Sequence, residues 1–195
     1  MTESPTLFEL PHPLYPFRLT ELADFRRGPY RLVNVFRRIT EEQRQACVRM
    51  WLEERVLPSE EAAWRRSLEV CYLLLDAEGG GLAGVNTAYV DRYPPQNAPY
   101  FFNRMFIRPA HRDSRLMIAG TAAAVCYLRM HHAEEGIRGV VNVNENPKLF
   151  RASVHQIFAG GGYRFEGFSD GRETWRLEFD SIRFVDGPPP GEASA

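Results

Sequence analysis

Cysteine and lysine are scarce in this sequence of 195 residues, and neither sign of charge prevails. Lys148 is the only lysine, and the three cysteines, Cys47, Cys71 and Cys126, lie far apart without a C-x-x-C pair. The sequence therefore offers no disulfide framework and is typical of a reducing compartment. Basic side chains number 24 and acidic ones 25, for a formal net charge of -1. With this balance, the chain cannot bind nucleic acid or anionic membranes through an overall positive charge.

Long hydrophobic runs are also absent. The most apolar stretch, residues 117–128, is too short to span a bilayer, and the N-terminus lacks a basic segment followed by an apolar one. We therefore expect a cytoplasmic protein with neither a membrane nor a nucleic-acid partner. Core-forming residues are plentiful: 44% of the residues are hydrophobic and 12% aromatic, enough for one sizeable core in one domain.

Proline marks the two ends of that domain. Five prolines fall within residues 1–29, and they predict an extended arm without a regular helix or a central strand. Three consecutive prolines, Pro188 to Pro190, predict a disordered tail over 186–195. The folded domain is expected over 30–181.

Apolar spacing and turn residues predict eleven elements within the domain. Thr40 and Gln43 form a capping-box pattern at the start of the first helix. The order is strand, two helices, three strands, helix, strand, helix and two strands, which indicates an α/β or α+β fold with a crossover connection. The predicted helices span 41–57, 59–66, 113–135 and 147–158. The predicted strands span 30–39, 68–75, 82–90, 100–107, 140–143, 163–168 and 174–179.

Two segments carry a family resemblance. Met105 to Arg112 has the pattern apolar-apolar-apolar-x-Pro-x-x-Arg, and 141–167 has a strand, Asn146, and a helix ending in Gly162-Tyr163. Together they resemble the GCN5-related N-acetyltransferase (GNAT) superfamily over about 30–180. The resemblance implies a mixed, mostly antiparallel seven-stranded sheet flanked by four helices.

The same resemblance implies an activity. It is the transfer of an acetyl or other acyl group from an acyl-CoA to a small-molecule or peptide amine, by direct attack in a ternary complex. No metal is implied, and the adjacent His131 and His132 diverge on a helix without a third ligand. Family members often form homodimers.

The resemblance also assigns the donor-binding residues. Phe106, Ile107 and Arg108 would hold the pantetheine arm, and Asn146 belongs to the later motif. The pyrophosphate would lie at a helix N-terminus, where backbone N–H groups are unpaired. The residues that would hold it there are Arg112, Asp113, Ser114, Arg115, Leu116 and Met117.

This loop departs from the family pattern, which carries glycines where Arg115 and Met117 stand. Two interpretations are open. Arg108, Arg112 and Arg115 replace backbone contacts with guanidinium–phosphate pairing, or the loop is closed and does not bind coenzyme A in the usual way.

The catalytic residues depart as well. The position of the family's general-acid tyrosine holds Phe158, which has no proton to donate. His155 is the substitute candidate on the same helix, able to relay a proton near neutral pH. Asn103 and Arg104 cannot act as a base, so Glu145 and Asp91 are the nearest acids for that role.

Two alternatives to acyl-CoA transfer keep the same fold. An acyl-carrier-protein thioester would need less of the glycine loop, and an arginine surface suits an acidic carrier protein. The missing glycines and tyrosine together favour a catalytically silent binding module, since a fold does not determine a function.

Overall fold

The computed structural model describes residues 6–9, 16–18, 24–114 and 116–186. The chain forms two compact units, and each is described by itself. The N-terminal unit comprises Ala23–Tyr89 and Arg104–Ala124. The C-terminal unit comprises Met1–Leu22, Val90–Asn103 and Val125–Ala195.

The order of α-helices and main-sheet strands agrees with the sequence prediction from residue 30 to residue 179, and β11 follows as a strand that was not predicted. The α-helices are α1 (Glu41–Glu53), α2 (Glu60–Ser67), α3 (Leu116–His132) and α4 (Ala152–Gly160). Short 3-10 helices are η2 (Pro94–Gln96), η3 (Pro109–Ser114), η4 (Ala133–Glu135), η5 (Pro147–Leu149) and η6 (Phe179–Ser181). The strands are β1 (Thr6–Glu9), β2 (Pro16–Arg18), β3 (Asp24–Arg27), β4 (Tyr30–Asn34), β5 (Val70–Asp76), β6 (Leu82–Tyr93), β7 (Ala98–Ile107), β8 (Gly139–Asn144), β9 (Arg164–Ser169), β10 (Arg172–Glu178) and β11 (Arg183–Asp186).

The main sheet has the strand order β3-β4-β5-β6-β7-β8-β10-β9. All seven predicted strands belong to it, and β3 adds an eighth strand at one edge. The pairing of β7 with β8 is parallel, whereas the pairs β3–β4, β4–β5, β5–β6, β8–β10 and β10–β9 are antiparallel. The predicted mixed, mostly antiparallel sheet flanked by four helices is therefore confirmed.

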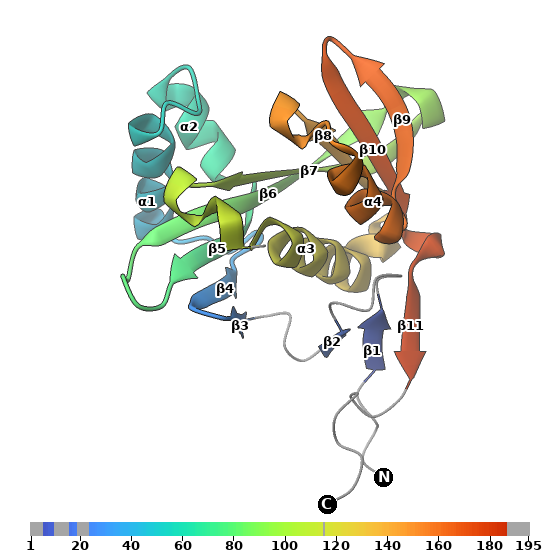
Figure 1. The fold of residues 1–195 in the computed structure, drawn as a ribbon, viewed down its shortest axis with the longest axis horizontal. Helices are drawn as coiled ribbons and strands as arrows, with labels where there is room; N and C mark the ends of the chain where they lie inside the picture. Colours follow the sequence, from blue (N-terminus) through green and yellow to red (C-terminus); the bar gives the residue numbers. More distant parts are fainter. Residues whose placement is uncertain (1–5, 10–15, 19–23, 115, 187–195) are drawn as a thin grey trace, which may run out of the picture. The chain divides into compact units, whose positions relative to one another are not determined.

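In the N-terminal unit, α1 and α2 pack side by side (Figure 1). Thr40 caps α1 by accepting from the Gln43 backbone N–H, and the Gln43 side chain accepts from the Thr40 N–H, as the capping-box pattern predicts. Trp51 and Met50 on the inner face of α1 are almost completely buried against Leu73 and Val85 of the sheet. This apolar packing holds the helical layer on the strands.

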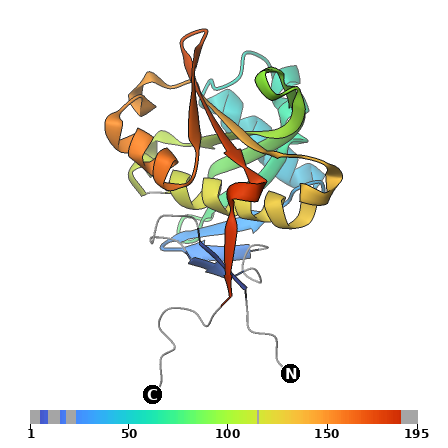
Figure 2. The ribbon, with the colours of Figure 1, turned by 90° about the vertical axis from the view of Figure 1, so that its right-hand side faces the viewer.

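In the C-terminal unit, α4 lies alongside the hairpin of β9 and β10 (Figure 2). Asp170 and Gly171 both have positive φ, at 51° and 72°, as a two-residue hairpin turn requires. A Cβ atom at Gly139 would lie 2.0 Å from the Leu177 carbonyl oxygen, so β8 and β10 approach each other closely there.

Three local predictions are corrected. The helix predicted over 41–57 ends at Glu53, and Arg55 adopts a left-handed conformation with φ 53° before Pro58 is reached. The helix predicted from 147 begins with η5, and regular α-helix starts at Ala152.

The third correction concerns the arm. A central strand does form within residues 1–29, because Thr6–Glu9 falls between prolines and pairs on both sides, with β11 and with β2. The predicted disordered tail lies outside the described residues from 187 onward, while Asp186 belongs to β11.

Candidate active site

The predicted donor-binding residues, except Asn146, lie in the N-terminal unit, where β7 ends and η3 leads to α3. Ile107 and Leu116 are buried, and Phe106 packs against the core of this unit. A Cβ atom on Gly84 would lie 2.5 Å from the Phe106 carbonyl oxygen, so the backbones of β6 and β7 are in close contact. The side chains of Ile107 and Leu116 serve the core, so these two residues offer a ligand mainly their backbone groups.

Arg108 is already engaged by two carboxylates of its own unit. Its Nη1 and Nη2 atoms each lie 2.8 Å from a carboxylate oxygen, of Glu54 and Glu53 respectively, and its Nε donates to the Leu82 carbonyl at 3.0 Å. The hydrogen bond to Glu53 is the main cause that raises the pKa of Arg108. A phosphate contact with Arg108 would have to compete with both carboxylates.

Arg112, unlike Arg108, is not paired with a carboxylate of the described residues. Its Nε donates to the Ile107 carbonyl at 3.0 Å, the residue is exposed, and no described acceptor meets Nη1 or Nη2. Met117 is partly buried. The side chains of Asp113 and Ser114 and the whole of Arg115 lie outside the described part of the chain. Arg112 is thus the described loop cation whose guanidinium can still meet an anion.

The other predicted site residues lie in the C-terminal unit, where Asp91 belongs to β6 and Glu145, Asn146 and His155 follow β8. Glu145 is exposed and makes no hydrogen bond or ion pair with any described residue. Asn146 is exposed too, and its Oδ1 accepts from the Lys148 backbone N–H at 3.0 Å, which starts η5. Asp91 is exposed and accepts from the Arg92 backbone N–H. No hydrogen bond or ion pair joins any of these three residues to His155.

His155 lies in the first half of α4 and has one specific partner. Its Nε2 is 2.5 Å from Oε1 of Glu173, and 36% of its side chain is exposed. The imidazole meets the Trp175 ring edge-on at 5.0 Å between centroids and tilts over Phe165 at 5.7 Å. The ring is therefore anchored at one nitrogen and packed against aromatic side chains, while part of it reaches solvent.

Sequence analysis missed Glu173, which is the most deeply buried carboxylate of this site, with an exposed fraction of 0%. Its Oε2 accepts from Asn144 Nδ2 and from Trp175 Nε1, both at 3.3 Å. A signal was present: the two-residue period of a strand puts Glu173 on the same face as Trp175 and Leu177. A carboxylate on such an apolar face requires several donors.

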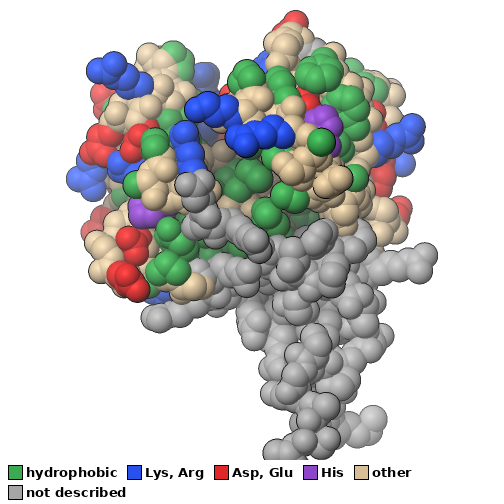
Figure 3. Space-filling model, in the orientation of Figure 1, with side chains coloured by type: hydrophobic (Ala, Val, Ile, Leu, Met, Phe, Trp, Pro, Cys, Tyr) green, Lys and Arg blue, Asp and Glu red, His purple; other side chains and the backbone are tan. Residues whose placement is uncertain are grey.

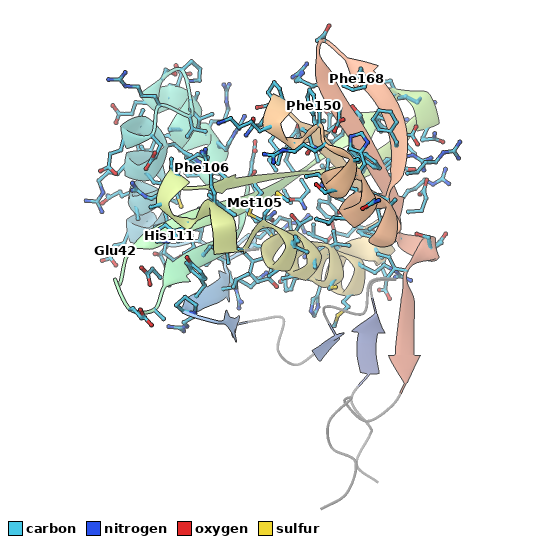
Figure 4. The ribbon with its side chains drawn as sticks, in the orientation of Figure 1. Glu42, Met105, Phe106, His111, Phe150 and Phe168 are labelled. Atoms are coloured by element: carbon cyan, nitrogen blue, oxygen red, sulfur yellow. The ribbon has the colours of Figure 1, made fainter. Side chains whose placement is uncertain are left out.

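Aromatic side chains surround this pair. Phe158, at the position of the family tyrosine, stacks on Trp175 at 5.1 Å and is buried. Phe165 and Phe168 are the exposed members, at 41% and 62%, and hydrophobic side chains appear on the surface that carries α4 and β9 (Figure 3). Phe150 and Phe168 meet edge to face at 5.6 Å (Figure 4).

Tyr163 is not an available acid in this unit. It is buried beside Phe158, and burial raises the pKa of its hydroxyl far above the ordinary value. The three cysteines are equally unsuited to nucleophilic chemistry. Each is buried, and burial raises the pKa of every thiol, for Cys47 to about 12.

A second carboxylate that sequence analysis missed is Glu69, in the N-terminal unit. Its Oε2 atom is buried and has no hydrogen-bond partner among the described residues. Burial raises the pKa of Glu69, and Arg66 and Arg104 oppose that shift. Arg104 itself lies over the Tyr89 ring, 4.9 Å from its centroid.

Neither a metal site nor a membrane-spanning helix is found among the described residues. No group of three or more His, Cys, Asp and Glu side chains there could hold a metal ion. Within the same residues, no helix has the length and hydropathy needed to cross a membrane.

Comparisons with known proteins identify the fold. No protein-family model and no curated protein sequence matches the chain. Among solved structures, the ribosomal-protein-S5-alanine acetyltransferase from Vibrio fischeri has a TM-score of 0.57 at 11% identity, over 82% of this chain and 98% of that one. A GNAT-family acetyltransferase from Streptococcus pneumoniae has a TM-score of 0.54 at 11% identity, over 76% and 99%. One from Bacillus anthracis has a TM-score of 0.51 at 8% identity, over 80% and 99%. The chain has the fold of the GCN5-related N-acetyltransferase superfamily.

Proposed function

We propose that this chain is an N-acyltransferase that moves an acyl group from an acyl-CoA, such as acetyl-CoA, to an amine by direct attack. The observation that carries the proposal is His155, a partly exposed imidazole whose Nε2 is held 2.5 Å from a fully buried carboxylate. An imidazole held at one nitrogen can accept and donate a proton at the other. The similarity of the fold to acetyltransferases supports acyl transfer as the reaction that this proton transfer would serve.

Arg112 is the residue proposed to meet the donor's pyrophosphate. The residues present suit an anion here, because Arg112 is exposed with two guanidinium nitrogens that no described acceptor meets. Backbone N–H groups at the start of α3 would add to this contact. Arg108 would instead keep the loop attached to α1 through Glu53 and Glu54.

Proton transfer is assigned to His155. A bound acyl-CoA supplies a thioester carbonyl carbon as the electrophile. His155 would accept a proton from the attacking amine, and the aromatic rings of Trp175 and Phe165 would keep the imidazole in place. Glu145, an exposed carboxylate at the end of β8, is the second candidate for proton acceptor. Asn146, in the same unit as His155, is a further candidate for a contact with the donor, because its side chain is exposed.

Calorimetric titration with acetyl-CoA tests the donor. We expect the wild-type chain to bind it and Arg112→Ala to bind about tenfold or more weakly, because a charged hydrogen bond is worth about 1.5–3 kcal/mol. Arg172→Ala is the matched control, since Arg172 is exposed at the hairpin and pairs only with Asp170 among the described residues. Absence of binding to the wild-type chain would overturn the proposal and favour a silent binding module.

A further inference from the structure

The Glu173 carboxylate is fully buried and depends on protein groups for its hydrogen bonds. Its side chain has no solvent exposure, so it must obtain from protein donors what water would otherwise provide. Three side chains supply hydrogen bonds: Asn144 and Trp175 at Oε2, and His155 at Oε1. An amide N–H and an indole N–H can only donate, which fits an ionised carboxylate that only accepts.

The partner of Oε1 fixes the state of the imidazole. Because Oε1 accepts, the proton of a neutral His155 must lie on Nε2, and the Nδ1 nitrogen is then a bare acceptor. No described residue hydrogen-bonds to Nδ1. The exposed part of the ring therefore offers one nitrogen for proton exchange, and the buried part holds the other.

From this geometry we infer that Glu173 is a positioning residue, which holds His155 as the Nε2–H tautomer so that Nδ1 exchanges protons with the reactants. The inference rests on the proposed function for its chemical purpose. Glu173 touches no reactant and acts through His155 alone.

The proton balance of the transfer closes at Nδ1. As the new C–N bond forms between a neutral amine and the thioester carbon, Nδ1 of His155 accepts the proton that the amine nitrogen loses. The C–S bond breaks, its electron pair stays on sulfur, and Nδ1 passes the same proton to that sulfur as a free thiol. Between these steps the imidazolium is stabilised by the Glu173 carboxylate, to which its Nε2–H donates.

If Glu173 positions His155, the substitution Glu173→Gln should change the tautomer of His155. A purely structural role of Glu173 predicts no such change. Two donors, from Asn144 and Trp175, converge on the Oε2 position, so the amide oxygen of a glutamine is expected to take that position. The amide NH2 group then faces His155 and donates to Nε2. The imidazole must move its proton to Nδ1, and the nitrogen that served the reactants is blocked.

Nitrogen-15 NMR of the histidine side chains tests this inference without any activity measurement. The sequence contains five histidines, and comparison with His155→Gln assigns the His155 signals. At a pH where the imidazole is neutral, we expect the Nε2–H tautomer in the wild-type chain and the Nδ1–H tautomer in Glu173→Gln. Glu166→Gln is the control, because Glu166 is also largely buried but pairs with Arg176, and it should leave the His155 tautomer unchanged.

The NMR outcomes distinguish failure of the positioning role from failure of the proposed function. If His155 in the wild-type chain is the Nδ1–H tautomer or a mixture of both, the inference is overturned, even if Glu173→Gln does not fold. If the tautomer changes as expected but no amine is acylated, the positioning stands and the proposed function fails. With an active protein, we expect Glu173→Gln to lower kcat by about 100-fold with little change in the KM for acyl-CoA.

Discussion

Two charged groups in this molecule, Arg108 in one unit and Glu173 in the other, differ in what their partners leave available. Arg108 is held by Glu53 and Glu54, so its charge is neutralised within the protein. Glu173 is also fully paired, but its partner His155 keeps a second nitrogen that no described residue uses. A paired charge thus supports chemistry only where its partner retains an unused group.

The largest expected effect is a difference in stability between variants of two carboxylates, Glu173 and the Arg108 partner Glu53. Glu173→Ala would leave the buried donors of Asn144 and Trp175 without an acceptor, and we expect the free energy of unfolding to fall by about 3 kcal/mol. Glu53→Ala should cost less than about 1 kcal/mol, because 60% of the Glu53 side chain is exposed and Glu54 still pairs with Arg108. Urea unfolding of both variants measures the difference, and equal losses would remove the distinction.

The second comparison separates two arginines of the same loop. We expect Arg112→Ala to weaken acetyl-CoA binding about tenfold, whereas Arg108→Ala should change the affinity within about twofold, because its charge is already neutralised by Glu53 and Glu54. Calorimetry measures both affinities, and thermal unfolding reports separately on the ion pairs that Arg108→Ala removes. A large loss of affinity in Arg108→Ala would show that phosphate displaces the two carboxylates.

The smallest effect concerns Glu69, whose buried Oε2 has no hydrogen-bond partner among the described residues. Burial raises its pKa in the folded chain, so the folded state binds more protons than the unfolded state between the two pKa values. The contribution of Glu69 to stability therefore falls as the pH rises through that window. Glu69→Gln should stabilise the chain more, relative to wild type, at neutral pH than at about pH 3. Urea midpoints at the two pH values measure this, and a pH-independent difference would contradict it.

Local sequence signals predicted most of the fold. The capping box at Thr40 and Gln43 and the turn at Asp170-Gly171 depend on residues close in sequence, and both form as predicted. The end of α1 was predicted too late, because the apolar spacing continues past Glu53 although the backbone turns left-handed at Arg55. Periodicity indicates where a helix is stable but gives less information on where it ends.

The candidate site was less predictable, since hydrogen bonds between distant strands and helices determine it. His155 was identified from its chemistry and its helix, but Glu173 follows it by 18 residues on another element. The motif position of Arg108 suggested a phosphate contact, and nothing local to it indicated Glu53 and Glu54, which precede it by more than 50 residues. Sequence indicates which residue types are present, and tertiary pairing decides which of them remain available.

Amine-dependent release of free thiol from acetyl-CoA, measured for the wild-type chain and His155→Gln over a panel of amines, tests the central claim most directly. We predict turnover by the wild-type chain and a kcat about 100-fold lower in His155→Gln, with an unchanged dissociation constant for acetyl-CoA. Equal turnover by the two proteins, or none by the wild-type chain with any amine, would contradict the assignment of His155 as the proton-transferring residue of an acyltransferase.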